Sequence, residues 1–226
     1  MIAKNLLNIL SYIYFVFQST FKMTKEKYLE DLKDIKDIMD RSSRFISLSG
    51  LSGVCAGVFA LVGAYLAYQT VYYQQAYVDY RVAVIDTGSI LKLIGIALGV
   101  IILSFLFGIY FTTKKAKEKN QKLWDRSTKL LLGNFFIPLA AGGILCLMLL
   151  VKGYIGFVAP FTLIFYGLAL VNASKYTLSQ IKSLGVMEII LGLIATHYIG
   201  YGLVFWALGF GVLHIVYGLL IQQQDG

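Results

Sequence analysis

Six long apolar segments dominate this chain, and they constrain its fold more than any other feature. A helix needs about 20 mainly apolar residues to cross a bilayer. Lipid offers no hydrogen bonds to an open backbone, so each crossing segment has to be helical. The sequence therefore predicts an all-α polytopic membrane helix bundle with about six transmembrane helices, at residues 45–68, 90–111, 130–151, 155–172, 184–199 and 203–221.

The basic residues between these segments predict the orientation. Seventeen of the 20 Lys and Arg lie in residues 1–44, 112–129 and 173–183, which all fall on one side of a six-span topology. The gaps on the other side contain Arg81 and Lys152, and Lys92 lies just inside a span. Cytoplasmic loops retain Lys and Arg, so we expect a multi-pass protein of the bacterial inner membrane with both termini in the cytoplasm.

Composition excludes several other classes. The chain is 58% hydrophobic and 14% charged, whereas soluble domains are about 45–50% apolar and about 25% charged. The net charge of +8 lies beside the crossings, which favours contact with anionic lipid headgroups over nucleic acid. Cys55 and Cys146 both fall within apolar segments, so they are interpreted as small buried residues, and neither a metal nor a cofactor is predicted.

The N-terminal region divides into two parts. Residues 1–22 form an apolar extension, interpreted either as an extra interfacial or membrane-inserted helix or as sequence upstream of a true start at Met23. Residues 23–44 predict a charged amphipathic cytoplasmic helix, because Tyr28, Leu32, Ile35 and Met39 share one helical stripe. This helix is expected to lie on the membrane or bundle, with a short dimerisation helix as the alternative.

The rest of the chain is expected to form three transmembrane hairpins. The first is residues 45–111, the second is 130–172 and the third, with a short tail, is 173–226; the basic loop 112–129 joins the first two. Small residues let membrane helices approach closely. We therefore predict a helix-packing face, used within the subunit or in a homo-oligomer, at Ser49, Gly53, Gly57, Ala60 and Ala64.

Polar groups at membrane depth are the candidates for a functional site, because burying one is costly and usually requires a partner. Glu188 and His214 are expected to lie about 6 Å and 10 Å from the cytoplasmic ends of spans five and six. We interpret them as a hydrogen-bonded pair that responds to pH, or, more simply, as two separate groups that contact cytoplasmic water and a backbone carbonyl.

Two asparagines complete a predicted polar cluster of Asn134, Asn172, Glu188 and His214. Pro138 removes the helical hydrogen bond to the carbonyl of residue 134, and the Asn134 side chain is expected to compensate. The alternative is that all four residues line one polar cavity. Two histidines on separate helices make a poor metal site.

Internal similarity links the last two hairpins. A shift of 44 residues aligns Tyr154-Ile155-Gly156 with Tyr198-Ile199-Gly200, Phe161 with Phe205 and Gly167 with Gly211. The two hairpins are therefore interpreted as tandem copies in parallel orientation.

Two stretches resemble known families. Gly192-Leu193-Ile194-Ala195, Gly200-Tyr201-Gly202, Gly209, Gly211 and Tyr217-Gly218-Leu219 resemble the hairpin repeat of six-span bacterial acid-resistance membrane proteins. Residues 41–50, Arg-Ser-Ser-Arg-Phe-Ile-Ser-Leu-Ser-Gly, are similar to uncharacterised bacterial inner-membrane proteins with a charged N-terminal helix. Neither resemblance implies a catalytic motif, and the charged helix departs from the acid-resistance pattern.

Together these features predict a nonenzymatic membrane protein with a structural or regulatory role. The sequence contains no Walker loop, HExxH, CxxC or GxSxG motif. A small transporter or proton-responsive channel that uses the polar cluster is the alternative. A lipid-modifying enzyme is less favoured, because few carboxylates or histidines gather near one interface.

Overall fold

The fold was taken from a computed structural model of the full chain. The structure describes residues 27–28, 31–32, 35, 49–71, 87–118 and 123–223. It divides into two units, Met1–Arg44 and Phe45–Gly226. In the first unit the described residues are helical and exposed, including Tyr28, Leu32 and Ile35 of the predicted apolar stripe. The predictions for residues 1–22 and Met39 lie outside the described residues.

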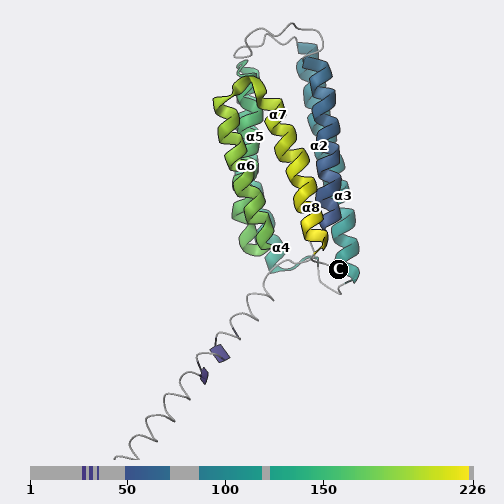
Figure 1. The fold of residues 1–226 in the computed structure, drawn as a ribbon, viewed down its shortest axis with the longest axis vertical. Coiled ribbons are helices and arrows are strands. Elements are labelled where there is room, and N and C mark those ends of the chain that lie inside the picture. Colours follow the sequence, from purple (N-terminus) through teal and green to yellow (C-terminus); the bar gives the residue numbers. More distant parts are fainter. Residues whose placement is uncertain are drawn as a thin grey trace, which may run out of the picture. The chain divides into compact units, whose positions relative to one another are not determined.

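The second unit is a helix bundle (Figure 1). Its six spans are α2 (Gly50–Val71), α3 (Thr87–Glu118), α4 (Arg126–Val151), η1 with α5 (Ile155–Phe157 and Val158–Ala173) and η2 (Ser174–Tyr176), α6 (Ser179–His197), and a final composite helix. The last span comprises η3 (Ile199–Tyr201), α7 (Gly202–Trp206), the π-helical η4 (Ala207–Leu213) and α8 (His214–Gln223). All six are long and apolar enough to cross a membrane, and the described residues include no strand. The predicted fold class is confirmed.

Several helices extend beyond their apolar segments. α3 continues to Glu118 and includes Lys114, Lys115 and Lys117, so much of the predicted basic loop is helical. Lysines in a last helical turn interact favourably with the helix dipole. α4 begins where the Asp125 side chain accepts a 2.7 Å hydrogen bond from the Thr128 amide, which is an N-cap. A side-chain cap therefore decides where α4 begins, and α3 continues through residues that hydropathy alone assigns to a loop.

Packing places the composite last helix between two groups of helices. α2 contacts α3 on one side and α8 with η4 on the other, while α5 contacts α4, α6 and α7. In Figure 1 the yellow α7 and α8 accordingly lie between the α2–α3 pair and the α4–α6 group. The main buried cluster, made by residues from α5, α6 and α8, is Leu170, Ile181, Leu184 and Ile221.

Glycines make the closest helix contacts. A Cβ on Gly57 would lie 2.6 Å from the Gly211 carbonyl, and one on Gly167 would lie 2.5 Å from the Gly185 carbonyl. Gly53 also faces α8, and Ser49, Ala60 and Ala64 are buried. The predicted packing residues therefore lie at contacts within the subunit.

The two predicted repeat units, the last two hairpins, have the same local structure at the turn between their two spans. A short 3-10 helix covers Ile155–Phe157 in one and Ile199–Tyr201 in the other, which is the 44-residue shift found in the sequence. The residues before them, Tyr154 and Tyr198, also share similar backbone angles (φ −82°, ψ 51° and φ −106°, ψ 62°). The units then diverge, because α5 is regular whereas the last span contains the π-helical η4.

Candidate functional site

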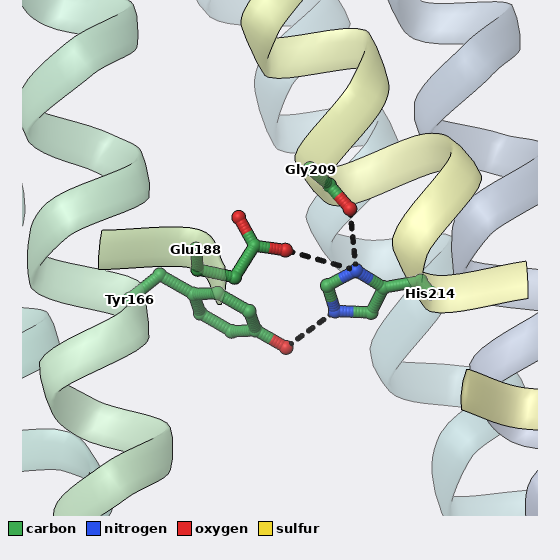
Figure 2. A network of polar contacts seen from close by, with 4 residues as sticks. All are labelled: Tyr166, Glu188, Gly209 and His214. Carbon is green, nitrogen blue, oxygen red and sulfur yellow. Dashed lines mark hydrogen bonds and ion pairs between the residues drawn. The ribbon is translucent and has the colours of Figure 1, made fainter. Parts of the chain in front are cut away.

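A buried polar network lies where α5, α6 and the last span meet (Figure 2). We call Tyr166, Glu188, Gly209 and His214 the His214 network. Glu188 is the central residue of α6, with 0% of its surface exposed. His214 begins α8 directly after η4 and is 7% exposed. Both lie nine residues from the end of their span, about 14 Å along the helix, which is deeper than expected because α6 begins at Ser179 and the last span continues to Gln223.

His214 contacts three groups. Its Nε2 lies 2.8 Å from the Tyr166 hydroxyl, and its Nδ1 lies 3.0 Å from the Gly209 carbonyl oxygen. The same Nδ1 lies 3.4 Å from Oε1 of Glu188. Glu188 and His214 therefore lie in contact, but the hydrogen bond from Nδ1 of His214 goes to a backbone carbonyl, as the simpler interpretation of the sequence expected. Figure 2 shows the three partners around one imidazole.

The surroundings determine which imidazole nitrogen carries hydrogen. A carbonyl oxygen only accepts hydrogen bonds, so the contact with Gly209 requires hydrogen on Nδ1. In a neutral imidazole Nε2 then lacks hydrogen and accepts from the Tyr166 hydroxyl. Both ring nitrogens of His214 are satisfied in this arrangement.

The carboxyl group of Glu188 is less well hydrogen-bonded than the imidazole of His214. Neither carboxyl oxygen has a hydrogen-bond partner among the described residues, and both are buried. A Cβ on Gly209 would collide with Oε2 of Glu188 and lie 2.5 Å from Leu163 Cδ2. Glycine at position 209 therefore leaves just enough space for the carboxyl group.

The π-helical segment positions the network. A π-helix widens the helical turn and often occurs at functional sites. Here η4 ends at Leu213, and the His214 side chain binds the carbonyl of Gly209 within the widened turn. Phe210 of η4 stacks on the imidazole, with ring centroids 5.9 Å apart and planes at 18°. The aromatic ring and the backbone together hold His214 in one orientation.

The two asparagines form a separate contact. Asn172 donates a 3.1 Å hydrogen bond from Nδ2 to the backbone carbonyl of Asn134, the carbonyl that Pro138 deprives of its helical donor. The Asn134 side chain instead bonds the Leu130 carbonyl at 2.8 Å. The expected compensation therefore occurs, but Asn172 provides it from the neighbouring helix.

This contact predicts different effects for the two asparagines. Asn172→Leu leaves the Asn134 carbonyl without a donor and is expected to reduce stability by about 1–2 kcal/mol. Asn134→Leu removes only a bond within its own helix and should cost clearly less. Unfolding of both variants in detergent checks this, and equal losses would contradict the assigned role of Asn172.

The predicted polar cluster thus separates into two parts. Asn172 lies six residues beyond Tyr166, about 9 Å along α5, and contacts α4 rather than the His214 network. Sequence reasoning missed Tyr166 and Gly209. A lone tyrosine in the middle of an apolar span was the available signal for the first; the second depends on tertiary contact alone.

The site offers little for metal binding. Among the described residues no group of three or more His, Cys, Asp or Glu side chains could hold a metal ion. Cys55 and Cys146 are free thiols. The chemistry of the His214 network is therefore that of one carboxyl, one imidazole and one phenol, which can bind and exchange protons.

No known family, curated protein or solved structure matches this chain. The resemblance to acid-resistance membrane proteins rests only on the glycine and tyrosine positions between Gly192 and Leu219.

Proposed function

We propose that this chain is a nonenzymatic integral membrane protein with a structural or regulatory role. The observation that carries the proposal is its closely packed centre, where glycine contacts join α2 to α8 and α5 to α6 and Glu188 is fully buried. A groove of about 580 Å³ is lined by Leu66, Gln69, Thr70, Ser89, Lys92, Gly95 and Ile96. None of these residues belongs to the predicted polar cluster.

The distribution of Lys and Arg supports a location in the bacterial inner membrane with both termini cytoplasmic. A reporter that is active only in the periplasm should then be inactive when it is fused to the C-terminus.

On the cytoplasmic side, the basic residues favour anionic lipid headgroups as partners. The exposed Tyr28, Leu32 and Ile35 of the N-terminal helix suit contact with lipid, another protein or a second copy of this chain.

A second candidate function is a small transporter or proton-responsive channel. Ionisable residues at membrane depth usually mark ion or proton pathways, and transporter sites often lie at mid-membrane beside interrupted helices. Glu188 supports this candidate, because it lies at the centre of α6 and next to the π-helical η4.

Reconstitution in lipid vesicles distinguishes the two functions. We expect the wild type and Glu188→Gln to show equal, leak-level proton and ion flux. The matched control is Glu118→Gln at the exposed end of α3. Flux in the wild type and Glu118→Gln that Glu188→Gln abolishes would instead establish the transport function.

A further inference from the structure

The His214 network has one hydrogen on Nδ1 for two nearby oxygens. Nδ1 carries at most one hydrogen, yet two oxygens lie near it: the Gly209 carbonyl at 3.0 Å and Oε1 of Glu188 at 3.4 Å. The shorter contact is a hydrogen bond, whereas the Glu188 carboxyl has no hydrogen-bond partner within the described part of the chain. The Nδ1 hydrogen is thus committed to Gly209.

An ionised Glu188 would be poorly accommodated here. It would place a full charge in a site with no exposed surface and with no hydrogen-bond donor from residues 49–71, 87–118 or 123–223, which is strongly unfavourable. A carboxylic acid carries no net charge, so its burial costs far less than burial of the carboxylate.

We propose that Glu188 is a proton-binding site whose occupancy controls the contact between α6 and the π-helical η4. With the proton bound, the neutral carboxyl packs against Gly209 and Leu163. Once the proton leaves, a full charge remains in the buried site without a hydrogen bond from any described residue, and hydration of that charge favours separation of α6 from η4.

The groups around Glu188 limit the site to the binding and release of one proton. Among the described residues, His214 of α8 contacts the carboxyl, Tyr166 of α5 binds the far nitrogen of the same imidazole, and η4 contributes the backbone of Gly209. A second proton would make the buried site cationic, with no described acidic partner beyond Glu188 itself.

A movement of η4 can also alter the packing of α2, which belongs to the first hairpin. Gly211 of η4 faces Leu61 of α2, and the Gly211 carbonyl lies against Gly57. A shift of η4 away from α6 therefore alters its contact with α2. This proposal is independent of whether the protein also transports an ion.

Infrared difference spectroscopy of the full chain in lipid vesicles, recorded across a pH series, tests the proton site. We expect a carboxylic-acid carbonyl band at neutral pH that disappears at higher pH. It should persist in Glu118→Gln and be absent in Glu188→Gln. Absence of such a band in the wild type at neutral pH, or its persistence in Glu188→Gln, overturns the proposal.

A second variant and a second measurement cover the case in which Glu188→Gln does not fold. Gly209→Ala introduces a methyl group against the ends of two flexible side chains, Glu188 and Leu163, and should shift the band. Amide hydrogen exchange of η4, corrected for the intrinsic effect of pH, should speed up as the band disappears. Unchanged exchange, or a band that Gly209→Ala leaves in place, contradicts control of the contact by Glu188.

Discussion

Gly218→Ala is expected to destabilise the protein by about 1–3 kcal/mol, the usual range for overpacking a closely packed interior. The added Cβ would lie 2.7 Å from both the Gly50 carbonyl oxygen and the Val54 amide nitrogen. Both are backbone atoms of α2, so relief requires α2 and α8 to separate. Reversible unfolding in mixed detergent micelles measures the loss.

The matched control for this substitution is Gly99→Ala. Among the residues described by the structure, no atom outside the backbone of α3 lies within 4 Å of a Cβ added at position 99. Alanine favours a helix over glycine by about 1 kcal/mol. We therefore expect Gly99→Ala to be neutral or stabilising. Equal destabilisation by the two substitutions would contradict a glycine contact between α2 and α8.

His214→Phe is expected to be similarly or more strongly destabilising. Phenylalanine keeps a ring beside Phe210 but removes both nitrogens, which leaves the Tyr166 hydroxyl and the Gly209 carbonyl without their partner. Each buried group left unpaired costs about 1–3 kcal/mol. The free energy of unfolding in detergent, compared with wild type, measures this effect.

Two further variants separate hydrogen bonding from general damage. His197→Phe, at the exposed end of α6, should have little effect. The double variant His214→Phe with Tyr166→Phe removes the orphaned hydroxyl together with the imidazole, so it should be more stable than His214→Phe alone. If the loss in the double variant equals the sum of the losses in His214→Phe and Tyr166→Phe measured alone, the contact between Tyr166 and His214 contributes nothing to stability.

Both predictions depend on contacts between spans that are distant in sequence, and this marks the limit of what sequence reasoning reached. The six spans were predictable, because lipid requires every crossing backbone to satisfy its own hydrogen bonds and the apolar segments of this chain are long. The glycine and alanine positions on α2 were also predictable as a contact face, since small residues recur there at helical spacing.

The partners across those contacts were not predictable. Periodicity places Gly57 on a face but does not say that Gly211 lies opposite it. The carbonyl freed by Pro138 was foreseeable from the chemistry of proline, whereas its donor came from Asn172, which is 38 residues away in sequence. Helix boundaries also differed; α4, for example, begins where the Asp125 side chain caps its first turn rather than where its apolar residues begin.

By itself, the sequence of this protein determined that six helices form and which of their residues are polar at membrane depth. Both follow from local chemistry: the apolar length of each segment and the cost of burying an ionisable group. Only the tertiary structure decided that Tyr166, Glu188 and Gly209 surround the imidazole of His214, because the widened turn of η4 sets the direction of the imidazole and the packing of three separate spans supplies its partners.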